Sequence, residues 1–146
     1  MGASVLQVIR LLALLLVFVL GGACAHTKKT SDLQTLRPVV EGFHQRVRWK
    51  DYRYAIRYIV PERRQDFEKA RREQHDERDL SITDYEIEDV QLVEEGQRAI
   101  VTSRMEWMRL PSVTQQSDTV TSEFIYRDGT WLLEKQRGGP FDGELP

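Results

Sequence analysis

Apolar and polar positions divide the 146-residue chain into three stretches of different periodicity. Residues 11–20, LLALLLVFVL, form an unbroken apolar run. From residue 38 to about residue 73, apolar residues recur every three or four positions, which is typical of helices. From residue 82 to about residue 136, apolar and polar residues alternate, which predicts strands. This order of patterns favours an α+β domain behind a short apolar leader.

Three helices are predicted in the first part of the domain. Pro38 suits the first position of a helix because it lacks an N–H group, and the apolar stripe that follows it comprises Val39, Val40, Phe43 and Val47. Asp51 is placed to cap a second helix, which ends before Pro61. Pro61 begins a third helix that is very polar, with Phe67 and Ala70 as its clearest packing residues.

Four strands are predicted from the alternating stretch, over residues 82–93, 98–110, 119–126 and 130–136. The alternation changes parity near Glu88, which indicates a β-bulge in the first strand. Asp128-Gly129 is a strong signal for a two-residue type I′ turn. This turn places Tyr126 opposite Trp131 in a closing hairpin.

These features together resemble the nuclear transport factor 2-like superfamily. The resemblance covers residues 37–137 and depends on the helix order, the PERRQDF segment, the long strand that ends in MEW, and the YRDGTWLLEK hairpin. It implies a cone in which a curved antiparallel sheet of about four strands wraps an amphipathic first helix. A cystatin-like α+β sheet with one long helix is the alternative fold.

Cys24 is the only cysteine and follows the apolar run closely. The run is shorter than the roughly 20 residues that a bilayer-spanning helix needs, and it matches the ~7–15 residues of a secretory signal. The segment LGGAC resembles the lipobox of bacterial lipoproteins, although Gly21 stands where an aliphatic residue is usual. The resemblance implies cleavage before Cys24 and a lipid on its sulfur. An uncleaved membrane anchor is the alternative interpretation.

The expected organisation follows from these two resemblances. Residues 1–23 are a signal peptide, residues 24–36 hold the lipidated cysteine and a flexible tether, residues 37–137 form the domain, and residues 138–146 form a C-terminal tail. Ala25, rather than an aspartate, follows the cysteine. By resemblance this implies the outer membrane, with the domain facing the periplasm.

Charge is distributed unevenly along the chain, whose overall net charge is −2. Residues 46–78 carry 11 Lys/Arg and 7 Asp/Glu, a net charge of +4, whereas residues 79–146 carry 6 and 14, a net charge of −8. Solvated helix faces explain such a bias, and a contact surface for anionic partners is the alternative. A nucleic-acid partner is not expected, because the chain lacks a strong basic excess.

Composition also limits the chemistry. A single thiol excludes a disulfide within the chain, and three scattered histidines offer no tetrahedral metal set. No glycine-rich phosphate loop is present. We therefore expect neither a metal nor a cofactor.

The expected function is non-catalytic binding of an envelope protein or a small apolar ligand inside the cone. A homodimer through the strands that carry Met105, Trp107 and Phe124 is also expected. A small acid–base enzyme that uses Glu106 or His44 is the alternative. The candidate pocket residues are Phe43, His44, Tyr54, Tyr58, Met105, Trp107, Phe124 and Trp131.

Overall fold

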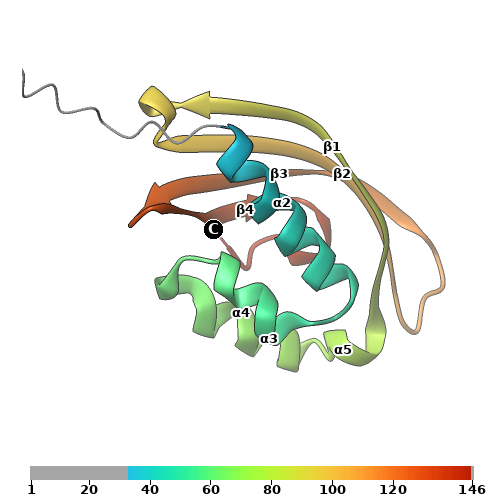
Figure 1. The fold of residues 1–146 in the computed structure, drawn as a ribbon. Helices are drawn as coiled ribbons and strands as arrows, with labels where there is room; N and C mark the ends of the chain where they lie inside the picture. Colours follow the sequence, from blue (N-terminus) through green and yellow to red (C-terminus); the bar gives the residue numbers. More distant parts are fainter. Residues whose placement is uncertain (1–32, 146) are drawn as a thin grey trace, which may run out of the picture.

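Helices precede the sheet along the chain and cover one of its faces (Figure 1). The computed structural model describes residues 33–145, so the predicted signal peptide, Cys24 and most of the predicted tether lie outside the described residues. The helical elements that precede the sheet are α2 (Leu33–Arg48), α3 (Tyr52–Ala55), η1 (Ile56–Tyr58), α4 (Pro61–Glu73) and α5 (Asp76–Asp79), and two short 3₁₀ helices, η2 (Glu94–Gly96) and η3 (Gly139–Phe141), come later in the chain. The predicted α+β class with an antiparallel sheet of four strands is confirmed.

Helix α2 lies beneath the curved sheet (Figure 1). It buries the predicted stripe except Val39, which is partly buried, and extends it by one turn. Its buried residues are Leu36, Val40, Phe43, His44 and Val47. The helix begins at Leu33, inside the stretch predicted as a tether, and the prediction that Pro38 begins it is wrong. Pro38 lies within the helix, where it cannot donate the usual hydrogen bond to the carbonyl of Gln34.

The next two helical segments begin where the sequence predicts. Asp51 occupies the N-cap position of α3, but its carboxylate makes no capping bond and instead accepts a hydrogen bond from Arg46 Nη1 at 2.8 Å. Pro61 lies in the first turn of α4, and Phe67 in the middle of that helix is fully buried.

The sheet is a meander of β1 (Leu80–Val93), β2 (Arg98–Arg109), β3 (Gln116–Arg127) and β4 (Thr130–Arg137), in that spatial order. The closing hairpin has the predicted register, with Tyr126 opposite Trp131. Its turn residues Asp128 and Gly129 have φ values of 52° and 84°, as a type I′ turn requires.

Strand β1 contains two register shifts, between Ile82 and Asp84 and between Ile87 and Asp89. The second confirms the bulge predicted near Glu88. Bulges bend a strand and increase its twist. The bent β1 and its neighbours therefore arch over α2 (Figure 1).

The C-terminal segment packs on the domain, although residues 138–146 are predicted as a tail. Phe141 and Leu145 are buried. The backbone N–H of Gln136 donates to the carbonyl of Leu145 at 2.8 Å. The first turn of α2 is joined to β4 by a hydrogen bond, which Trp131 Nε1 donates to Thr35 Oγ1 at 3.1 Å.

A buried ionic cluster joins this C-terminal segment to the helices. The side chain of Arg71 is 3% exposed, lies 2.8 Å from Asp76, and also contacts Glu144. Its guanidinium carbon lies 4.1 Å from the centroid of the Phe141 ring. Arg109 from β2 contacts the second oxygen of Asp76. Burial lowers the pKa of Arg71 to about 10, so it remains charged at neutral pH and balances Asp76.

We expect the substitution Arg71→Ala to destabilise the fold by about 3 kcal/mol, because it removes a principal cation from a buried carboxylate. Urea denaturation followed by circular dichroism would measure the free energy of unfolding. Arg72→Ala is the matched control, since Arg72 is exposed on the same helix, and it should change that free energy by less than about 0.5 kcal/mol. Equal effects of the two substitutions would contradict this account.

Candidate binding groove

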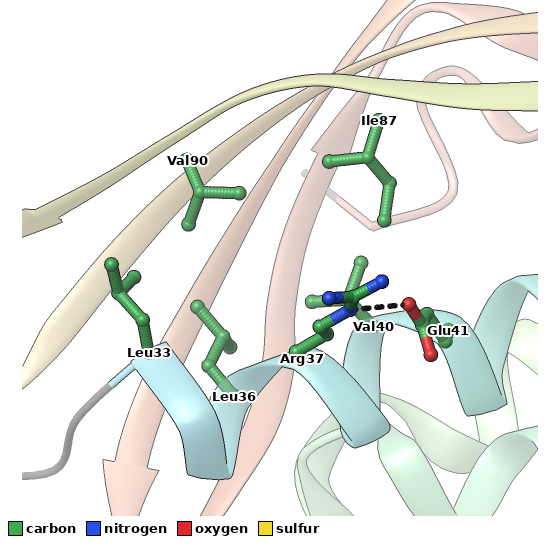
Figure 2. Close-up of a pocket in the computed structure, with 7 residues that line it drawn as sticks. All are labelled: Leu33, Leu36, Arg37, Val40, Glu41, Ile87 and Val90. Atoms are coloured by element: carbon green, nitrogen blue, oxygen red, sulfur yellow. Dashed lines mark hydrogen bonds and ion pairs between the residues drawn. The ribbon is translucent and has the colours of Figure 1, made fainter.

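An apolar groove lies between the first half of α2 and the middle of β1 (Figure 2). Its volume is about 310 Å³. Five apolar and two charged residues line it, namely Leu33, Leu36, Val40, Ile87, Val90, Arg37 and Glu41. Leu36 and Val40 are 1% exposed, whereas Leu33 at one end is 49% exposed. The groove therefore runs from the surface down to the core.

The bulge in β1 places both strand residues on the groove side. Ile87 and Val90 are three positions apart, so in a regular strand they would point to opposite faces. The register shift between Ile87 and Asp89 adds one residue to the strand, and this restores a common direction for the two side chains. Figure 2 shows both residues across the gap from the α2 side chains.

The charged pair lies on the helix side of the groove. Arg37 Nε donates to Glu41 Oε1 at 2.7 Å, and both side chains are substantially exposed, at 77% and 46%. Because both side chains are exposed, the ion pair between them contributes little stability. Either side chain can therefore leave the pair and bind a polar group of a ligand. The groove thus combines an apolar floor with one exposed ion pair at its side.

His44 lies one helical turn beyond Val40 and is 1% exposed. Its ring stacks on Tyr85 of β1, with 4.8 Å between the ring centroids. Nδ1 lies 2.8 Å from the carbonyl oxygen of Val40. A carbonyl only accepts, so Nδ1 carries the proton and Nε2 is left as a buried acceptor without a hydrogen-bond partner. Burial lowers the pKa of His44, which keeps the ring neutral.

The structure does not bring the predicted pocket residues together around one cavity. Four of them are at most 1% exposed and form the packed core, namely Phe43, Met105, Phe124 and Trp131. Tyr58 and Trp107 are partly buried against that core, and Tyr54 is exposed on the surface. These large side chains fill the space between the helices and the sheet, where the sequence predicts the interior of a cone.

The location of Met105 and Phe124 also bears on the predicted homodimer. Both side chains are fully buried, on the sheet face that the helices cover. They are therefore not available to a second copy of the chain in this structure. A dimer would have to use other residues, and it stays a prediction.

Glu106 lies on the opposite face of the sheet from Met105, as alternation along a strand requires. It accepts a hydrogen bond from Gln115 and lines a polar depression of about 380 Å³. Arg104, two residues earlier, donates to Glu86 at 2.6 Å. Glu106 on β2 and His44 on α2 therefore lie on opposite sides of the sheet and do not converge on one site.

Sequence reasoning missed the groove because its residues belong to two elements whose packing only the fold decides. The parity change in β1 was a usable signal, since it places Ile87 and Val90 on one side. Among residues 33–145, no three His, Cys, Asp or Glu side chains gather in a way that could hold a metal ion. No helix within this range is long and apolar enough to cross a bilayer.

Comparison with known proteins bears on the fold. The chain is similar to the solution structure of a SEC-C motif-containing protein from Rhodopseudomonas palustris, with a TM-score of 0.55 and 19% sequence identity. The likeness covers 69% of this chain and 76% of that chain. At this identity it supports the α+β architecture alone. No family model and no curated protein matches the sequence.

The buried His44 predicts a pH dependence of stability. Its pKa in the folded state lies below the ordinary value of 6.5, so the unfolded chain binds the proton more readily. The contribution of the neutral His44 to the free energy of unfolding should therefore be at its maximum above about pH 6.5. It should fall as the pH drops below that value, by up to about 1.4 kcal/mol per pH unit.

His44→Phe keeps a ring against Tyr85 and removes the titrating group, so this part of the pH dependence should disappear. Denaturant titrations between about pH 4.5 and 7.5 would measure it. His75→Gln is the control, because His75 is exposed and its removal should leave the dependence intact. An unchanged slope in His44→Phe would contradict the assignment.

Proposed function

We propose that this chain is a lipid-anchored protein of the bacterial cell envelope whose domain binds a small apolar ligand in the groove between α2 and β1. The groove is the observation that carries the proposal. Its volume of about 310 Å³ falls at the lower end of the ~300–1,000 Å³ typical of small-molecule sites. An apolar lining with one polar pair at the side is also typical of such sites.

The chemistry of the lining favours an aliphatic ligand. Leu33, Leu36, Val40, Ile87 and Val90 are all aliphatic, and each methylene transferred from water onto such a surface contributes about 0.8 kcal/mol. Arg37 can leave Glu41 to pair with an anionic end group on the ligand. A short acyl chain with a carboxylate or phosphate end fits both features.

A binding role is better supported than the acid–base alternative. An enzyme of that kind needs a tuned acid or base beside a cavity with convergent polar groups. His44 is not among the residues that line the groove, and its one hydrogen bond goes to its own helix. Glu106 faces a depression on the other side of the sheet.

The finer fold assignment and the location belong to the same proposal. A curved sheet that arches over the first helix (Figure 1) supports a nuclear transport factor 2-like cone, here with a filled interior. The LGGAC segment and Ala25 support a lipidated Cys24 and an outer-membrane location facing the periplasm.

A photoreactive fatty acid tests the groove. With a diazirine-bearing eight-carbon acid added to membranes that contain the protein, cross-links should map to residues 33–41 and 87–90 by peptide mass spectrometry. Val90→Phe fills the groove and should reduce the labelling about tenfold, as expected when ~1.4 kcal/mol of apolar contact is lost.

The matched control is Gln91→Phe, which adds the same ring on the adjacent, exposed position of β1. It should leave the labelling unchanged. Labelling that spreads evenly over the domain, or that Val90→Phe does not reduce, would contradict a ligand site in the groove. A cross-link from the groove to another envelope protein would instead identify a protein partner.

The anchor is tested separately. Mass spectrometry of protein isolated from cells should find an amino terminus at Cys24 with acyl chains attached. Cys24→Ser should prevent this modification, because serine lacks the acylated sulfur. Two or more acyl chains hold a protein stably, so acylated protein should remain with membranes after a carbonate wash. A free thiol at Cys24 would contradict the anchor.

A further inference from the structure

An exposed tryptophan and an exposed tyrosine lie among arginines where α2 meets α3 and η1. The side chain of Trp49 is 74% exposed and that of Tyr54 is 37% exposed. Residues 46–57 contain five Arg/Lys and one Asp, a net charge of +4. We use the term cationic aromatic surface for Arg46, Trp49, Arg53, Tyr54 and Arg57. The apolar groove described above uses none of these residues.

Three helical segments bring cations to one ring. The guanidinium carbons of Arg46, Arg53 and Arg57 lie 5.4, 5.6 and 4.6 Å from the centroid of the Tyr54 ring. Contacts of this length are cation–π interactions. They hold the positive charges close together on the surface, although like charges repel.

Two of these cations lack a carboxylate. Arg46 is bonded to Asp51, but neither Arg53 nor Arg57 contacts an Asp or Glu side chain within residues 33–145. A guanidinium group that has no carboxylate partner is suited to donate hydrogen bonds to phosphate oxygens. The surface therefore has unused capacity for anions, and the exposed indole of Trp49 lies between Arg46 and Arg53 in the sequence.

We propose that the cationic aromatic surface rests against anionic phospholipid headgroups of the membrane that holds the chain, an inference that depends on the lipid anchor of the proposed function. Tryptophan and tyrosine are favoured at membrane interfaces because their rings are amphipathic. Neighbouring Lys/Arg residues are attracted to anionic lipids. The same five residues supply both preferences.

The anchor makes this contact geometrically accessible. The tether from Cys24 to Leu33 can span at most about 30 Å at ~3.3 Å per residue. Helix α2 has 16 residues and is about 24 Å long, so the far end that carries the surface lies within reach of the membrane. Tethering also raises the effective concentration of the second contact, and a weak interaction then becomes sufficient.

Fluorescence quenching tests the contact. The acylated full-length protein is reconstituted into vesicles of phosphatidylcholine, or of the same lipid with about 30 mol% phosphatidylglycerol as the anionic component. Both contain a lipid with a nitroxide on its headgroup. The difference between the parent protein and Trp49→Phe isolates the quenching of Trp49. It should be several-fold greater in the anionic vesicles and fall in roughly 0.5 M salt, which screens the attraction.

Two double variants with the same change in net charge distinguish the effect of this surface from the effect of net charge. Arg53→Glu/Arg57→Glu should reduce Trp49 quenching in the anionic vesicles to the phosphatidylcholine level. Lys135→Glu/Arg137→Glu, which changes the net charge equally on edge strand β4, should not reduce it. Circular dichroism melts would show that both variants keep the fold.

The outcomes separate the anchor from the surface. Protein that floats with the vesicles but shows equal Trp49 quenching in both lipids overturns the surface and leaves the anchor intact. Equal effects of the two charge-reversed pairs also overturn it. Protein that does not float at all overturns the anchor and the inference that depends on it. Cross-linking of this surface to an acidic envelope protein, with Trp49 unquenched by vesicles, would assign the surface to that partner instead.

Discussion

The packing of α2 beneath a curved sheet is the constraint on which the other features depend. Four apolar side chains of the helix are at most 1% exposed against the core, and burial of each contributes about 1.5–3 kcal/mol. Strand β1, which faces the helix, bends at its bulges. The first turns of α2 and the middle of β1 therefore do not close on each other, and the space between them is the groove in Figure 2.

The ionic cluster at Arg71 holds the opposite end of the domain together. Such a cluster adds little to the net free energy of unfolding, since the cost of desolvating the charges offsets most of their attraction. It does define the arrangement, because Asp76 on α5 and Glu144 near the C-terminus must both reach one buried guanidinium. Phe67 and Phe141 flank the same cation at 4.7 and 4.1 Å, which keeps the C-terminal segment on the core.

The groove and the cationic aromatic surface lie at opposite ends of α2. The proposed anchor at Cys24 precedes Leu33, at the groove end of α2, by nine residues, and the proposed lipid contact lies at the other end of the helix. A domain that touches the membrane at two points along one helix would have a restricted orientation, and its groove would open close to the leaflet. The proposed acyl ligand is chemically consistent with that position, because a membrane would supply it.

Periodicity and turn chemistry in the sequence determined the element types, the four-stranded antiparallel sheet, the Glu88 bulge and the Tyr126–Trp131 register, because local patterns encode these features. The Asp128-Gly129 turn is one example, since few residue pairs adopt its backbone angles. Tertiary structure decided whether each side chain is packed in the core, lines a cavity or meets solvent. Met105, Phe124 and Trp131 have the same alternation in a filled core as in an open cone, and only packing distinguishes the two. Helix α2 begins at Leu33, five residues before the predicted start. Contacts of its first turn with Trp131 and burial of Leu36 stabilise this extension. Burial of Arg71 depends on Asp76 of α5 and on Glu144 near the C-terminus, partners from separate segments whose meeting no local pattern encodes.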